Sequence, residues 1–208
     1  SQNPQSVSVT PGAYTNSGNI LFYKLKKDLT QINTLSKFGY PNTQIKKIEI
    51  DAMNVDSCGY IYFGGFGLPG LPVSADAFKS TGSANGNMYF GIFNPDFSAL
   101  KFASYYGGNA MPFQDHDDGG LNYFDDRGYF YHAVCVSKDF PISSNAYSPY
   151  NIKDSVSQGG NNLAVTNSDA FVKIDLHTFV NASSSLGGEL RSCNPITATF
   201  VASSNYGL

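Results

Sequence analysis

Short apolar runs separated by polar turns recur along this chain. The first run covers Ile20 to Leu25, and a second ends at Phe38-Gly39. A third covers Ile45 to Asp51, and a turn at Cys58-Gly59 precedes the run Tyr60 to Phe63. Apolar runs of this length, with turn signals every ~8–12 residues, predict short antiparallel strands rather than helices.

The same landmarks return further along the chain, which indicates an internal repeat. An Ala-aromatic pair that closes a turn of small residues stands at Ala13-Tyr14, Ala77-Phe78 and Ala146-Tyr147. The landmarks after the second pair are Met88 to Phe93, Tyr106-Gly107, Arg127-Gly128, Tyr129 to His132 and Pro141, and Ala170 to Ile174 follows the third pair. Each unit is therefore predicted to hold four short strands.

Four strands in a repeat of long period are typical of a β-propeller blade. The predicted fold is all-β, with blades that are four-stranded antiparallel sheets at 13–66 and 77–136 and a partial third unit at 146–182. The polar stretch Ser148 to Asn167 is predicted to be an exposed insertion. Because propellers close with about four to eight blades, this is an incomplete ring. We expect the chain, which begins at Ser1, to be a segment of something larger.

The composition agrees with a strand-rich fold and excludes several classes of function. The chain has 208 residues with 21 Gly, 14 Tyr and 16 Phe, and only 14% of its residues are charged, against ~25% in ordinary soluble domains. The net charge of −3 comes without a basic stripe, which disfavours nucleic-acid binding. No stretch approaches the ~20 apolar residues of a membrane span. The three cysteines lack zinc-site spacing.

The second unit carries a resemblance to a known family. It contains Asn94-Pro95-Asp96, Ser104-Tyr105-Tyr106-Gly107-Gly108, Asp117-Asp118, Gly128-Tyr129-Phe130-Tyr131 and Asp139-Phe140-Pro141, and the third unit keeps Asp169 to Asp175. This order resembles the bacterial repeats that build seven-bladed β-propellers in surface and secreted proteins of Bacteroidota. The resemblance spans roughly residues 6–175.

The C-terminal tail resembles a different module. A Ser/Gly-rich linker is predicted at 183–192, and Cys193 to Phe200 then resembles the first strand of a PKD-type, immunoglobulin-like domain, placed at 193–208. In the family such domains follow propellers in proteins exported by the type IX secretion system. If Cys193 opens that domain, its disulfide partner is expected beyond Leu208.

The resemblance implies a non-enzymatic module, extracellular or on the outer cell surface. It would act in protein–protein interaction, adhesion or scaffolding, with a protein or further blades of the same polypeptide as partners and possible contacts to the secretion or surface machinery. One alternative is a carbohydrate-binding module that binds glycans through exposed tyrosines. A second is part of a secreted hydrolase whose catalytic residues lie outside this chain. The sequence names no ligand.

One cluster has the composition of a cation site. Asp115, Asp117 and Asp118 precede Gly119-Gly120, and alternating carboxylates on a tight turn are typical of Ca²⁺ loops. The other interpretation is a structural loop in which Asp and Gly serve the turn. Beyond this calcium hypothesis no cofactor is expected.

Other chemistry-bearing residues favour structural roles. Cys135 and His132 are three apart on a predicted strand, so they should lie on opposite faces rather than form a dyad. Asp125 and Asp126 precede the turn Arg127-Gly128, where a turn role is favoured over acid–base work. No catalytic residue is therefore assigned.

The alternating tyrosines Tyr60, Tyr62, Tyr129 and Tyr131 are interpreted either as packing between blades or as a surface for sugar stacking. Phe38 and Tyr106 are expected at equivalent buried sites of successive blades. An incomplete ring should also leave open apolar faces, on which Tyr60, Tyr62, Phe90, Phe93 and Tyr131 would be partly exposed.

Overall fold

The computed structural model describes residues 8–40, 47–109, 115–116, 122–125, 129–137, 139–147, 156–158, 161–163, 168–176, 180–183 and 189–192. These residues contain no helix, and their strands are β1 Ile20–Leu25, β2 Ile32–Phe38, β3 Ile48–Val55, β4 Ile61–Gly67, β5 Asn87–Phe93, β6 Leu100–Tyr106, β7 Asn122–Phe124, β8 Tyr129–Val136, β9 Val156–Gln158, β10 Asn161–Leu163, β11 Ser168–Asp175, β12 Val180–Ser183 and β13 Glu189–Ser192. The predicted all-β class is confirmed.

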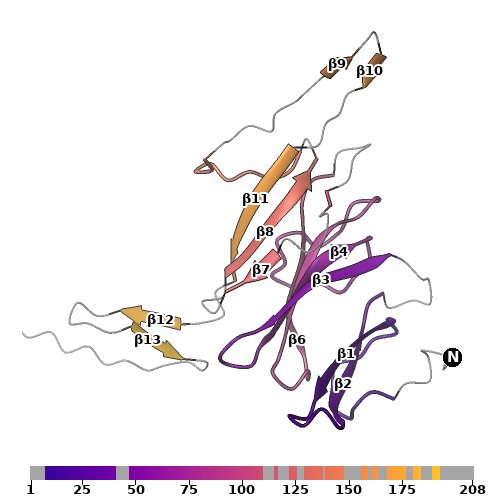
Figure 1. The fold of residues 1–208 in the computed structure, drawn as a ribbon, viewed down its shortest axis with the longest axis vertical. Coiled ribbons are helices and arrows are strands. Elements are labelled where there is room, and N and C mark those ends of the chain that lie inside the picture. The colour runs from indigo at the N-terminus through magenta and orange to yellow at the C-terminus, as the bar shows by residue number, and fades with distance from the viewer. Residues whose placement is uncertain are drawn as a thin grey trace, which may run out of the picture.

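The strands form three main sheets, in which every pairing is antiparallel (Figure 1). Sheet A is β1-β2, sheet B has the order β3-β4-β5-β6, and sheet C has the order β11-β8-β7. Two further hairpins pair β9 with β10 and β12 with β13.

Sheet B lies between the other two sheets, and every residue of its central strands β4 and β5 is buried. Alternate side chains therefore enter two different cores. In the A–B core, Phe22 of sheet A packs on Phe63 with ring centroids 4.9 Å apart. In the B–C core, Phe90 packs on Phe130 of sheet C at 5.6 Å. The molecule is thus a stack of sheets held together mainly by aromatic rings.

Glycines on the central strands allow this close stacking. A Cβ built on Gly64 would lie 3.2 Å from the Phe130 ring, and one on Gly91 would lie 2.5 Å from the Phe63 ring. The Phe130 ring thus fills this space from sheet C, whereas Phe63 is the direct partner of Gly91 on β4, so that its ring lies over this glycine within sheet B. The Gly-rich run in β4 serves sheet packing.

Two strand pairs of the structure have matching geometry. β1-β2 and β5-β6 share one register, because Ile20 pairs with Phe38 and Met88 with Tyr106. The turns between these strands also match: Leu29 and Phe97 both have a φ of 59°. In each turn an Asp side chain, from Asp28 or Asp96, accepts a hydrogen bond from the backbone N–H two residues on.

The three Ala-aromatic pairs each close a turn with the same hydrogen bond. The amide of the Ala in each copy donates to the carbonyl oxygen three residues earlier: Ala13 to Thr10, Ala77 to Ser74 and Ala146 to Ser143, at 3.0, 3.2 and 3.0 Å.

The grouping of strands into sheets differs from the prediction of blades at 13–66 and 77–136. Sheet B joins the last two strands of the first repeat unit to the first two of the second, since β4 pairs with β5. A repeat of four strands can be divided at any point, and the long connection 68–86 suggested a boundary. That connection instead joins neighbouring strands of one sheet. Propeller ring and blade number stay predictions.

The expected partial exposure of five aromatic rings was wrong for three of them. Tyr62, Phe90 and Phe93 are at most 1% exposed, because sheets A and C cover both faces of sheet B. Tyr60 and Tyr131 are half-buried.

The predicted linker 183–192 contains β13, which pairs with β12. The tail 193–208, with Cys193, lies outside the described residues, whereas Cys58 is disulfide-bonded and Cys135 is a free thiol. The domain division stays a prediction.

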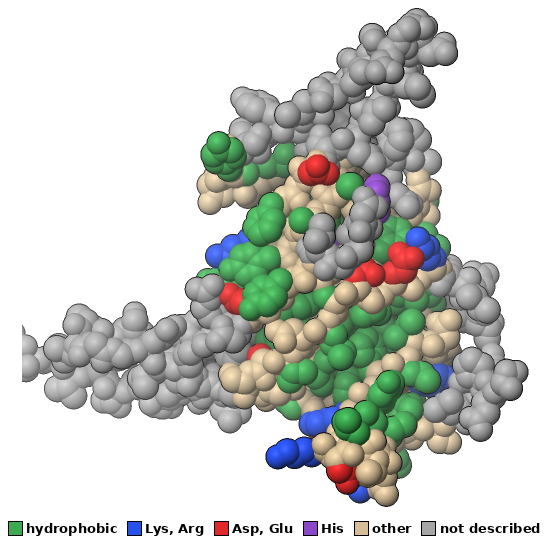
Figure 2. Space-filling view, viewed as in Figure 1, with side chains coloured by type: hydrophobic (Ala, Val, Ile, Leu, Met, Phe, Trp, Pro, Cys, Tyr) green, Lys and Arg blue, Asp and Glu red, His purple; other side chains and the backbone are tan. Residues whose placement is uncertain are grey.

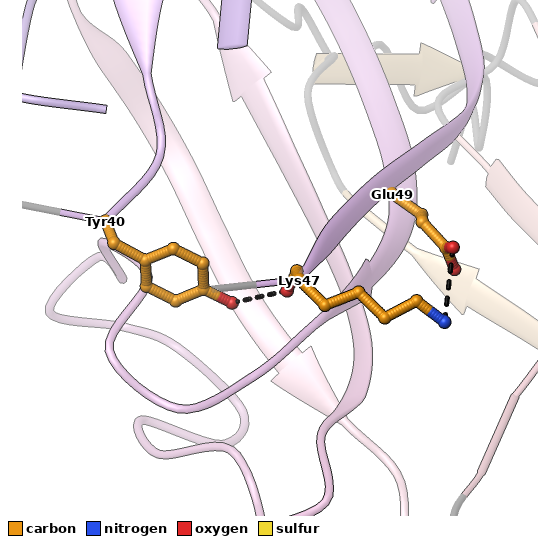
Figure 3. Close-up of polar contacts among 3 residues, drawn as sticks. All are labelled: Tyr40, Lys47 and Glu49. Carbon is orange, nitrogen blue, oxygen red and sulfur yellow. Dashed lines mark hydrogen bonds and ion pairs between the residues drawn. The ribbon is translucent and has the colours of Figure 1, made fainter. Parts of the chain in front are cut away.

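The chain passes from sheet A to sheet B beside Tyr40, which is buried (Figure 3). Its hydroxyl lies 2.9 Å from the carbonyl oxygens of both Lys47 and Leu68. Tyr105 donates to the same Leu68 carbonyl at 2.7 Å. The exposed ion pair between Lys47 and Glu49, at 3.2 Å, contributes little beside these buried contacts.

Candidate interaction surface

The residue of the calcium hypothesis that the structure describes, Asp115, is 1% exposed. One of its carboxylate oxygens accepts from the amide of Ser137 at 2.6 Å. The other accepts from the amide of Gly108 at 2.6 Å and from the Asn87 side chain at 3.3 Å. Asp115 thus fastens the loop after β6 to the end of β8. Asp117 and Asp118 lie outside the described residues, so the calcium hypothesis stays a prediction.

A lysine ammonium lies beside this junction. Nζ of Lys79 donates to the carbonyl oxygens of Gly107 and Gly108 at 3.0 and 3.1 Å, and to Oδ1 of Asn109 at 2.7 Å. Burial lowers the pKa of Lys79, while nearby Asp115 and Asp139 oppose that shift. The ammonium occupies the centre of this group of oxygens, as a bound cation would. Among the described residues, no group of three or more His, Cys, Asp or Glu side chains is placed to hold a metal.

Asp125 closes a turn, as one of the two interpretations expected. Its Oδ1 accepts from the amide of Tyr129 at 3.0 Å. Asp56 makes the same bond to Tyr60 at 2.9 Å in the preceding unit, and also accepts from the Tyr62 hydroxyl at 2.8 Å. Asp126 lies outside the described residues.

His132 and Cys135 lie on opposite faces of β8, as their spacing predicts. His132 is fully buried between sheets B and C, where its Nδ1 contacts the Tyr106 hydroxyl. The Cys135 thiol is half-buried on the other face, with Sγ 3.6 Å from Oδ1 of Asp169.

The largest group of exposed rings in the described residues covers the face of sheet C that points away from sheet B, here called the open face. Tyr123 and Phe171 are 63% and 73% exposed, and Tyr131 lies between them. The ring centroids of Tyr123 and Tyr131 are 6.3 Å apart with 28° between the planes; those of Tyr131 and Phe171 are 6.2 Å apart at 33°. Figure 2 shows hydrophobic side chains gathered over β7, β8 and β11.

A cation lies on the same face. Nζ of Lys173 is 3.9 Å from the ring centroid of Tyr129 and 5.7 Å from that of Tyr131, a cation–π arrangement. The exposed Asp169 lies on the same side of β11. The open face therefore combines aromatic area with charges of both signs.

The equivalent face of sheet B is covered by sheet C, so the two faces can be compared. There Tyr62 pairs with Ile92 and Phe66 with Met88, and all four side chains are buried in the B–C core. At the corresponding register of sheet C, Tyr131 pairs with Lys173 and Cys135 with Asp169. Apolar residues on the covered face are thus replaced by Lys and Asp on the open face. Another sheet of the same kind would bury these charges, which is costly.

Sequence reasoning identified Tyr129 and Tyr131 but missed Tyr123, Phe171 and Lys173. The replacement of Ile92 by Lys173 between aligned units was a usable signal. Tyr62, grouped with these tyrosines in the sequence, is instead packed 5.3 Å from Phe124 between the sheets.

No helix in the described part of the chain is long and apolar enough to cross a membrane.

Comparison with known proteins assigns no family to the chain. No family model matches it, and neither a curated protein nor a solved structure matches it.

Proposed function

We propose that this chain is a non-enzymatic interaction module of a secreted or cell-surface protein, and that it binds another protein through the open face of sheet C. The observation that carries the proposal is the row of Tyr123, Tyr131 and Phe171, whose outer members are more than half exposed. Exposed aromatic patches of this kind mark interaction sites on soluble proteins, and Tyr and Phe are enriched in protein interfaces.

The polar residues of the open face support binding to a partner rather than permanent burial. Lys173 and Asp169 are exposed beside the rings, so a partner needs matching charges at the rim of an apolar centre. The propeller-type stacking of repeated sheets would supply a rigid scaffold for this surface. Export by the type IX secretion system belongs to the same proposal and rests on the family resemblance of the sequence.

Single substitutions test the role of the open face. The chain is immobilised and exposed to envelope and culture-medium proteins of its native host. We expect a protein that is captured by the wild type, lost with Phe171→Ala or Tyr123→Ala, and retained with Tyr23→Ala. Tyr23 is the matched control, because it is 56% exposed on sheet A, away from the open face. Equal capture by all variants would contradict the proposal.

Carbohydrate binding is the second candidate, and the ring geometry favours it. The rings of Tyr123 and Phe171 are inclined to the ring of Tyr131 by 28° and 33°. The three rings therefore present neighbouring faces on which the apolar faces of sugars could stack. Asp169 and Lys173 would then bond sugar hydroxyls. A glycan array decides: oligosaccharide binding that Phe171→Ala abolishes and Tyr23→Ala preserves supports this candidate, and an array without hits speaks against it.

A further inference from the structure

Within the described part of the chain, no strand lies along the outer edge of β11, unlike the edges of its counterparts. The register with the preceding strand places β11 where β5 lies in sheet B, since Tyr62 pairs with Ile92 and Tyr131 with Lys173. β5 has β6 on its other side, and β1 has β2. Among the described strands, β11 pairs with β8 alone. An open edge of this kind is a template for a further strand.

In the first two units, the repeated turn binds the strand in this position. Thr10 donates its amide to the carbonyl of Leu35 at 3.0 Å, and its Oγ1 accepts from the Leu35 amide at 2.9 Å. Ser74 and Ala103 repeat this pair of bonds at 3.0 and 3.2 Å. The turn therefore fixes the strand that follows β1 or β5.

The third copy of the turn forms, but its aromatic residue is exposed to solvent. Ala146 donates to Ser143 at 3.0 Å, as in the other copies, but Tyr147 is fully exposed. By contrast, the Tyr14 ring lies 5.5 Å from that of Phe93, and the Phe78 ring lies 5.7 Å from that of Phe102. Among the described strands, none pairs with the outer edge of β11 in the way that β2 pairs with β1 and β6 with β5.

We propose that β12 is the occupant of this position and exchanges its partner β13 for the outer edge of β11. β12 is the next strand in the chain, and the connection 176–179 is shorter than 26–31 and 94–99, which join β1 to β2 and β5 to β6. The residues that continue β12 also match the ends of the two earlier strands: Ser184-Ser185-Leu186-Gly187 corresponds to Ser36-Lys37-Phe38-Gly39 and Ser104-Tyr105-Tyr106-Gly107.

The energetics favour this exchange. A hairpin of two short strands, such as β12-β13, is marginally stable in water, whereas a strand added to a larger packed sheet is stabilised by it. Adding β12 gives sheet C the same four strands as sheet B. The inference is independent of the ligand proposed for the open face.

Aligning the serines predicts the register. Because Ile92 pairs with Phe102 in sheet B, Lys173 should lie opposite Ala182. In the structure, Ala182 pairs with Leu190 of β13. Two engineered cysteine pairs that share position 182 can therefore distinguish pairing of Ala182 with Lys173 from pairing with Leu190.

The test is disulfide cross-linking in the full chain with Cys135→Ser as background. Lys173→Cys/Ala182→Cys reports the β11 edge, and Ala182→Cys/Leu190→Cys reports the hairpin. Phe171→Cys/Ala182→Cys, out of register by two residues, is the control. We expect the first pair to cross-link under mild oxidation, as read by non-reducing peptide mapping, and the control to react at least tenfold more slowly. Cross-linking of both the first and second pairs also supports the exchange. Cross-linking of the hairpin pair alone, of neither pair, or of the control as fast as the first pair overturns it.

Discussion

Phe38 and Tyr106 occupy the same position in two successive sheets. Each ends its strand opposite the first apolar residue of the partner strand, Ile20 or Met88, and each precedes a glycine with positive φ. Both rings pack on the following sheet: Phe38 lies 5.1 Å from Phe63 and Tyr106 lies 6.2 Å from Phe130. The two hairpins therefore share a contact with the following sheet as well as a strand register.

Removing either ring should destabilise the stack. Phe38 is 0% and Tyr106 is 7% exposed, so we expect Phe38→Ala and Tyr106→Ala to cost about 3–5 kcal/mol of unfolding free energy. Urea unfolding followed by circular dichroism measures the loss. Tyr23, 56% exposed on sheet A, is the control, and Tyr23→Ala should change stability by no more than about 1 kcal/mol. An unchanged urea midpoint for Tyr106→Ala would refute the equivalence.

Strands with strong local signals could be predicted from the sequence. β1 coincides with the apolar run at 20–25, and β2 and β6 end at the aromatic-Gly pairs. Which strands share a sheet could not be predicted, because pairing of β4 with β5 depends on contacts across the long connection 68–86. The repeat gives the order of the strands but leaves open where one sheet ends.

The open face could be predicted only in part. Tyr129 and Tyr131 follow strand alternation, so their common face is readable from sequence. Tyr123 lies on a three-residue strand that gives too short a pattern to detect. The exposure of Phe171 depends on what lies above sheet C, and its counterpart Phe90 is fully buried. Burial here is a property of the stack rather than of the residue.

Glycine substitutions should separate a tight contact within sheet B from a looser one between sheets B and C. An added Cβ would lie 2.5 Å from the Phe63 ring at Gly91 but 3.2 Å from the Phe130 ring at Gly64. We expect Gly91→Ala to destabilise by about 1–3 kcal/mol through overpacking and Gly64→Ala to cost less. Thermal unfolding of both variants gives the order. A larger loss for Gly64→Ala would show that the Phe130 ring can move away from an added methyl group less easily than the Phe63 ring.

Asp115 should matter for stability whether or not calcium is present. Its two oxygens accept from the amides of Ser137 and Gly108. An Asn side chain has only one acceptor oxygen, so Asp115→Asn leaves a buried amide without its partner and should cost about 1–3 kcal/mol. The variant is melted with excess Ca²⁺ and with EDTA, beside the wild type.

The wild-type melts decide the calcium hypothesis. We expect equal melting temperatures with EDTA and with Ca²⁺, because the described oxygens of this junction already have protein partners. A wild-type melting temperature that rises with Ca²⁺ by mass action would instead establish a site at the Asp-rich loop.

Buried tyrosine hydroxyls should make the fold sensitive to high pH. Burial raises the pKa of Tyr105 from its ordinary 10.0 to about 12, and it also raises the pKa values of Tyr40 and Tyr89. The folded state therefore keeps protons that the unfolded chain releases above pH 10.0. Stability linked to Tyr105 is complete below pH 10.0 and is lost as the pH rises through about 12.

Urea midpoints measured across this pH range should therefore fall in the wild type. Tyr105→Phe removes one titrating hydroxyl, together with its bonds to Leu68 and Leu71. The variant should be less stable at neutral pH, yet lose less stability between neutral pH and about 12, because one fewer buried group has to ionise. A loss as steep as that of the wild type would mean that Tyr105 ionises as easily in the folded protein as in the unfolded chain.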